Sequence, residues 1–119
     1  MTVAQIADRL ADYCRKDEFS QAQAELYADD AVSIEPFETP GFDKETRGLK
    51  ALKEKDKKFS AMVESRHGTT VSAPLVAGNA FSFVLTMDIK MKGREREKME
   101  ELCVYTVKDG KIIAEQFFM

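Results

Sequence analysis

Two glutamates stand where a carboxylate could move a proton on a bound molecule. Glu35 precedes Pro36 and follows Leu26-Tyr27-Ala28-Asp29-Asp30-Ala31-Val32-Ser33-Ile34, where a helix end runs into a strand. Glu101 belongs to an alternating, otherwise largely apolar row, in which burial would raise the pKa of a carboxyl. If the two carboxyls lie close together, they could divide the roles of base and acid on one substrate.

Each glutamate also has a structural interpretation, and both alternatives stay open. Glu35 could be a solvated carboxylate at the rim of a strand end, although functional acids are often found in such places. Glu101 could lie on an exposed strand end and pair with Arg94, Arg96 or Lys98, because alternation fixes the face of a strand poorly near its ends.

His67 is the only histidine, and a base that works near neutral pH is often a histidine. A surface or structural role for this residue, which precedes Gly68, is the alternative. With one histidine, and with Cys14 and Cys103 in no metal-ligand spacing, the sequence predicts no metal site and no cofactor. The cysteines are interpreted as two reduced, buried thiols.

Length and charge narrow the class of protein. The 119 residues predict a single domain over residues 1–119. A formal net charge of -3 and mixed-sign charged segments give no reason to expect nucleic acid as a partner. We also expect a cytoplasmic protein, because the chain shows neither a signal-peptide pattern nor an apolar run of membrane-spanning length.

Three helices are predicted in the first half of the chain. Thr2 with Gln5 forms a capping-box pattern for a helix to about residue 16, and Ser20 with Gln23 repeats that pattern for a short second helix. A third helix is predicted from about residue 46 to 63, with an apolar stripe on one side. The lysine-rich run from Lys53 to Lys58 is interpreted as its solvated surface.

From Thr69 onward the apolar pattern changes to period two, which is typical of strands. Gly78-Asn79, residues 93–97 and Asp109-Gly110 are turn signals between strands. The second half therefore predicts a four-stranded antiparallel meander, and the fold class is α+β, with the helices packed on one face of a curved sheet.

The order of helix, helix, strand, helix and four strands resembles the nuclear transport factor two-like superfamily, which includes SnoaL-like polyketide cyclases and ketosteroid isomerases. The segment from Tyr27 to Ala31 that leads to Glu35-Pro36 is similar to the ketosteroid isomerase segment in which an aspartate before a proline abstracts the substrate proton. The residues from Val107 to Phe118 are similar to the last hairpin of SnoaL-like domains. The resemblance implies a cone-shaped, curved antiparallel sheet wrapped around three helices, a SnoaL-like or cystatin-like roll, with Glu35 as the base.

The resemblance also shows departures from the isomerases. The tyrosine and the protonated aspartate that form their oxyanion hole correspond here to positions near Leu10 and Cys103, which are poor replacements. Tyr13, one helical turn after Leu10, could substitute for the tyrosine if its hydroxyl reaches the pocket. Within the superfamily the same pocket serves enzymes and plain binding proteins, so the fold alone does not choose between them.

The pocket of this superfamily opens between the helices and the concave sheet face. The residues predicted to line it for a small, mostly apolar ligand are Phe37, Phe59, Met62, Phe83, Leu85, Met87, Cys103 and Tyr105. Core packing is the alternative role for each of them.

Two functions are therefore considered. The first is a cofactor-independent enzyme of the isomerase, cyclase or dehydratase type, in which Glu35 moves a proton and Glu101 or Tyr13 stabilises the charge. The second is a ligand-binding or protein-interaction module without chemistry. A homodimer through the outer sheet face is also expected, because Val84, Leu102, Val104 and Thr106 make a moderately apolar patch there.

Overall fold

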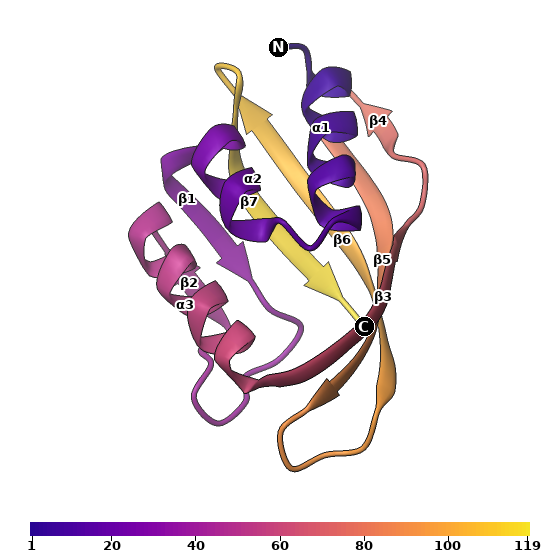
Figure 1. Ribbon diagram of the computed structural model, residues 1–119. Helices are drawn as coiled ribbons and strands as arrows, with labels where there is room; N and C mark the ends of the chain where they lie inside the picture. Colours follow the sequence, from indigo (N-terminus) through magenta and orange to yellow (C-terminus); the bar gives the residue numbers. More distant parts are fainter.

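Three helices lie against a curved, seven-stranded mixed sheet, which confirms the predicted α+β class (Figure 1). The computed structural model describes residues 1–119. The elements are α1 (Val3–Arg15), α2 (Phe19–Leu26), β1 (Tyr27–Ile34), β2 (Glu45–Arg47), α3 (Leu49–Met62), β3 (Val63–Val71), β4 (Leu75–Ala77), β5 (Ala80–Met91), β6 (Glu97–Lys108) and β7 (Lys111–Phe118). In Figure 1, α1 and α2 lie in front of the sheet, and α3 runs alongside β1 and β2.

The first helix begins at its predicted cap. The Thr2 side chain accepts a hydrogen bond from the Gln5 backbone N–H at 3.1 Å, and the Gln5 side chain accepts one from the Thr2 N–H at 2.8 Å. The capping box predicted at Ser20 is wrong. Helix α2 already begins at Phe19 and its N-cap, Glu18, makes no side-chain cap, because the chain turns one step earlier at Asp17, where φ is 56°.

Helix α3 begins at a glycine that no other residue would replace without strain. Gly48 is the N-cap with φ 92° and ψ 140°, a conformation essentially restricted to glycine. Its N–H donates to the carbonyl of Ala31 in β1 at 2.8 Å, and its own carbonyl accepts from Leu52 at 3.0 Å. This turn fixes α3 against β1, which is the contact that later brings the two elements' polar side chains together.

The sheet has one parallel pair that the sequence did not predict. Its strand order is β2-β1-β7-β6-β5-β3, with β4 paired to β5 beside this path. All neighbours are antiparallel except β1 and β7, so the sheet is mixed rather than purely antiparallel. Because β1 pairs with the last strand, residues far apart in sequence become neighbours: Ser33 lies opposite Glu115.

The strand expected before Gly78 is also divided. Strand β3 follows α3 directly and pairs with the second half of β5, whereas the short β4 pairs with the first half. Residues 72–74 between them belong to neither strand. Pro74 explains the interruption, since proline has no N–H to give to a strand ladder.

The inner face of the sheet forms most of the core. Along β5 every second residue is buried: Phe81, Phe83, Leu85, Met87, Ile89 and Met91. Buried residues of α1 and α2, among them Ile6, Leu10 and Leu26, pack in the same cluster. Among the helices, none combines the length and the apolar character that a membrane crossing requires.

We predict that Gly48→Ala destabilises the protein by about 1–3 kcal/mol, because a Cβ forces strain at this φ. Denaturant unfolding measures the change. Lys50→Ala, at an exposed position two residues along the same helix, is the control and should change stability by less than about 0.5 kcal/mol. Equal stability of Gly48→Ala and the wild type would contradict the strain assigned to this cap.

Candidate active site

A cavity of about 870 Å³ opens between the three helices and the inner face of the sheet. Of the 30 residues that line it, 17 are hydrophobic, which suits a mostly apolar ligand. Five of the six methionines are among them, namely Met62, Met87, Met91, Met99 and Met119. Flexible thioether side chains allow such a wall to adapt to ligands of different shape.

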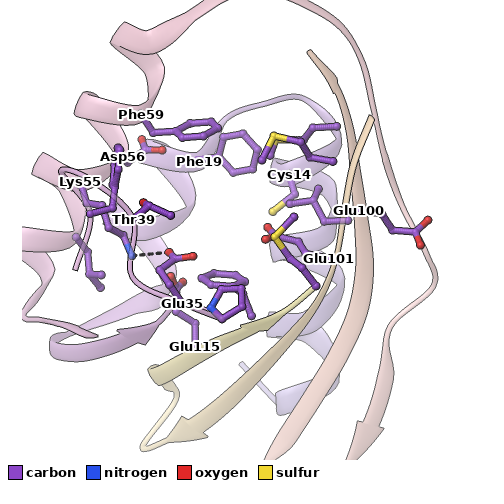
Figure 2. A pocket seen from close by; sticks show the side chains of 18 of the residues that line it. Cys14, Phe19, Glu35, Thr39, Lys55, Asp56, Phe59, Glu100, Glu101 and Glu115 are labelled. Atoms are coloured by element: carbon purple, nitrogen blue, oxygen red, sulfur yellow. Dashed lines mark hydrogen bonds and ion pairs between the residues drawn. The ribbon is translucent and has the colours of Figure 1, made fainter. Parts of the chain in front are cut away.

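Glu35 lies at the end of the inward row of β1. Ala31 and Ser33 are buried, and the same alternation carries Glu35 into the cavity wall. Its backbone N–H is held by the carbonyl of Lys44 at 2.7 Å. Its carboxylate pairs with Lys55 of α3, with 3.0 Å between Oε1 and Nζ, and 27% of the side chain is exposed (Figure 2). This inward orientation is the one that a role on a bound molecule requires.

Glu101 points into the same cavity from β6 (Figure 2). Burial raises the pKa of Glu101 to about 7, and the negative charges of Glu35 and Glu115 add to the effect, while Lys55 opposes it. The nearest polar contact of its carboxyl is the sulfur of Cys103 at 4.0 Å, a weak interaction. Near neutral pH, Glu101 is thus divided between a neutral acid and a carboxylate.

The alternative surface pairing of Glu101 does not occur. Arg96 pairs with Asp88 at 2.8 Å, Arg94 pairs with Glu97 at 3.9 Å, and Lys98 makes no ion pair to Glu101. Glu101 instead shares the inward row of β6 with buried Cys103 and Tyr105.

Glu115 is a third inward carboxyl, and the sequence analysis missed it. It is 6% exposed and accepts hydrogen bonds from two hydroxyls, Ser33 at 2.7 Å and Tyr27. Burial raises the pKa of Glu115, although these two hydrogen bonds favour its charged form. Glu115 faces inward because Ile113 has no partner on β6, so the alternation shifts by one residue at this bulge.

Lys55 joins these groups into one network. Its Nζ donates to Ser33 Oγ at 2.8 Å and to Glu35 Oε1 at 3.0 Å, and Ser33 in turn donates to Glu115. Only 16% of its side chain is exposed. A buried ammonium is stable only when paired, so the carboxylates and the lysine depend on one another. The interpretation of the run from Lys53 to Lys58 as the solvated surface of the helix is wrong for Lys55.

Asp56 and Gln23 are among the other polar side chains that line the cavity. Burial raises the pKa of Asp56, with the charges of Arg66 and Lys55 acting in the opposite direction. Gln23 of α2 is 9% exposed, and its Oε1 has no hydrogen-bond partner. In the sequence, Gln23 stands out only as part of the capping-box pattern with Ser20, and that pattern does not indicate that its side chain points inward.

The structure does not bring Tyr13 or His67 to this cavity. The Tyr13 hydroxyl donates to Glu25 at 2.7 Å and accepts from Arg9 at 3.1 Å on the outer side of α1 and α2. His67 lies exposed on β3, with its Nε2 2.9 Å from Ser65 Oγ. The Tyr13 hydroxyl is held by hydrogen bonds to the Arg9–Glu25 ion pair. Strand β3 is bulged and partly exposed, and His67 faces outward from it.

Six of the eight predicted pocket residues line the cavity, namely Phe37, Phe59, Met62, Leu85, Met87 and Tyr105. Phe83 and Cys103 do not. Both are buried in the core, where the Phe83 ring lies 5.3 Å from that of Tyr105, so the alternative of core packing holds for these two. No three His, Cys, Asp or Glu side chains are arranged to hold a metal ion.

Comparison with known proteins places this geometry in a family. Residues 1–119 match the profile of the SnoaL-like domain family. A Mesorhizobium loti protein, whose proposed identity is a SnoaL-like polyketide cyclase, is 32% identical, with full coverage of both chains and a TM-score of 0.91. A search of curated proteins finds no match.

Two more distant solved structures contain small molecules. A Catenulispora acidiphila protein with a ketosteroid isomerase-like fold was solved in complex with trimethylamine; it is 15% identical, with a TM-score of 0.75 over 97% of this chain and 85% of its own. TerC, co-crystallised with polyporic acid, is 12% identical, with a TM-score of 0.79 over 99% of this chain and 92% of its own. At these identities the likeness shows the fold.

The raised pKa of Glu101 predicts how stability depends on pH. Its carboxyl has an ordinary value of 4.5 and about 7 in the folded protein, so the folded state holds more protons between these values. Ionised Glu101 therefore costs about 3 kcal/mol of folding stability above about pH 7, a cost that is absent below about pH 4. Glu101→Gln removes this titration, so its stability relative to wild type should rise by about 3 kcal/mol between about pH 4 and pH 8.

Denaturant unfolding across this pH range measures the effect. Glu95→Gln is the matched control, because Glu95 is exposed and does not line the cavity. A relative stability of Glu101→Gln that is flat with pH would contradict the raised pKa.

Proposed function

Because this chain belongs to the SnoaL-like domain family, we propose that it binds a small, mostly apolar carbonyl compound and transfers a proton on it without a cofactor. One observation carries the proposal: Glu35 and Glu101 line the same cavity, Glu35 after β1 and Glu101 in β6, one paired with a cation and the other with a pKa of about 7. Two carboxyls with such different surroundings are suited to act as base and acid at one pH.

The roles follow from the surroundings of each carboxyl. Glu35 is paired with the Lys55 ammonium at 3.0 Å, and a carboxylate can accept the proton next to a carbonyl group. Glu101 in its neutral form can donate a proton, either to another carbon in an isomerisation or to a leaving oxygen in a dehydration. One turnover leaves Glu35 protonated and Glu101 ionised, and exchange of protons with water restores both groups.

The lining supports an apolar substrate with few polar groups. Aromatic and thioether side chains of Phe59, Met87 and Tyr105 offer flat or adaptable contact surfaces. The small molecules found in the Catenulispora protein and in TerC are consistent with a ligand site in this fold.

A binding module without chemistry is the second candidate, and one observation favours it. Neither position that corresponds to an isomerase oxyanion donor supplies one: Leu10 is apolar and Cys103 is buried in the core. In that case the carboxyls would only orient a ligand. The two functions differ in whether a bound ketone exchanges its protons.

We also propose that two copies associate through the outer sheet face in the cytoplasm. Leu102 and Phe118 are paired across β6 and β7 and are 41% and 47% exposed, on the face opposite the cavity. Such neighbouring apolar side chains favour a twofold contact. The free thiols of Cys14 and Cys103 fit a reducing compartment.

Proton exchange in a simple ketone tests the enzymatic proposal. We predict that the protein accelerates the replacement of the α-protons of β-tetralone by deuterium in D2O, measured by NMR. Glu35→Gln should slow the catalysed exchange by about 100- to 10,000-fold, the usual contribution of a general base. Glu95→Gln should leave the rate unchanged, since this exposed residue does not line the cavity. A wild-type protein that binds β-tetralone without exchange would support the binding module instead.

The dimer is tested by light scattering after size-exclusion chromatography at micromolar concentration. We expect the wild type to elute as a dimer and Leu102→Glu as a monomer, because a charge would lose its hydration in the contact. Lys50→Glu, a charge reversal at an exposed position of α3, is the control and should stay dimeric. A monomeric wild type would contradict the proposal.

A further inference from the structure

Lys55 is the cation that pairs directly with an inward carboxyl of the cavity. It lies within hydrogen-bond distance of Glu35, and its positive charge acts on Glu101, Asp56 and Glu115. Its side chain is 16% exposed, although lysine is among the residue types least often buried. Because the flexible lysine side chain is held in a largely buried position, we infer that its ammonium group has a specific role.

The ammonium is fixed from the sheet side. The Ser33 hydroxyl oxygen accepts a hydrogen bond from Lys55 Nζ at 2.8 Å, and the hydroxyl donates one to Glu115 at 2.7 Å. Tyr27 donates a hydrogen bond to the other carboxylate oxygen of Glu115. Because the Ser33 hydroxyl donates its single hydrogen bond to Glu115, its oxygen can only accept the hydrogen bond from Lys55. Glu115 therefore orients Ser33, and Ser33 orients Lys55.

One N–H of Lys55 has no protein partner. An ammonium carries three N–H groups, and the hydrogen bonds of Lys55 are those to Ser33 Oγ and Glu35 Oε1. Lys55 lines the cavity, as Glu35 does. The remaining N–H is thus available to a ligand beside the Glu35 carboxylate (Figure 2).

We propose that Lys55 is a catalytic residue, which donates this N–H to the carbonyl oxygen of the substrate while Glu35 removes a proton from the adjacent carbon. The inference rests on the proposed function and adds to it the group that stabilises the enolate. It also makes Ser33 and Glu115 positioning residues for Lys55.

The step is balanced and fits the geometry. The C–H bond breaks and its proton bonds to the Glu35 carboxylate. The C–H electron pair forms the C=C bond of the enolate while the π pair of the carbonyl moves onto its oxygen, with no oxidation or reduction. The carbonyl oxygen and the proton on the next carbon are close neighbours in the substrate, so a base and a donor that are 3.0 Å apart can reach both. A cation held in a partly buried site stabilises a developing oxyanion more than it would in water.

This role replaces the donors that the chain lacks. Leu10 and Cys103 provide no oxyanion donor, and Tyr13 is held by Glu25 outside the cavity. Lys55 reaches the site from a different element, α3, and its charge compensates for the weaker geometry of a single donor.

The test measures binding of an oxyanion analogue rather than turnover. para-Nitrophenolate carries its charge on an oxygen, and para-nitroanisole has the same ring without the charge. We expect Lys55→Met to weaken para-nitrophenolate binding by about 10- to 100-fold, as for the loss of a charged hydrogen bond, and to leave para-nitroanisole binding unchanged. Lys50→Met, an exposed lysine of the same helix, is the matched control and should bind both probes like the wild type.

Ser33→Ala provides a second variant that keeps the charge and removes its anchor. It should weaken para-nitrophenolate binding by less than Lys55→Met does, again with para-nitroanisole unaffected. Equal binding of para-nitrophenolate by the wild type and Lys55→Met would overturn the role of Lys55, as would a wild type that binds only para-nitroanisole. Either result would leave the proposed function standing, because that function fails separately, when β-tetralone is not exchanged.

Discussion

The hydrogen-bonded ion pair between Lys55 and Glu35 is the interaction on which the interior of this protein depends, because it keeps charge inside a mostly apolar cavity. Each carboxylate that leaves water needs a partner or loses its charge. Lys55 serves Glu35 directly and Glu115 through Ser33, and Glu101 is left without a cation. Burial and this uneven pairing give the acids different surroundings, on which the chemistry that we propose depends.

Two irregular features of the sheet bring these residues together. The parallel pairing of β1 with β7 sets Ser33 opposite Glu115, and the bulge at Ile113 turns Glu115 from the outer to the inner face. The third feature is the glycine cap of α3, which ties that helix to β1 and so directs Lys55 toward Glu35. Together these three features position the polar side chains of the site.

These departures also explain what the sequence could predict. The helices, the long alternating strands, the α+β class and the row that contains Glu101 follow from local periodicity, and the structure has them. The choice of Glu35 came from the family resemblance. Glu115 was not predicted because a bulge breaks the alternation that would have indicated its inward orientation. The parallel strand pair was not predicted because no local pattern encodes which strands pair.

Side chains whose partners come from other elements were the hardest to place. Lys55 resembles the other lysines of α3 in sequence, and only the tertiary contact with β1 distinguishes it. Tyr13 shares a helix face with residues that line the cavity, yet its hydroxyl is captured by Glu25 of the next helix. Helical spacing determines the direction in which a side chain points, but it does not determine which polar group its end will bind.

A crystal structure of the protein with β-tetralone bound would test the central claim most directly, because it shows where the carbonyl group lies. The account predicts the ketone inside the cavity, with its oxygen within hydrogen-bond distance of Lys55 Nζ and its α-carbon facing the free oxygen of Glu35. A ketone bound in the cavity with its oxygen turned away from Lys55, or one bound only at the outer surface, would contradict it.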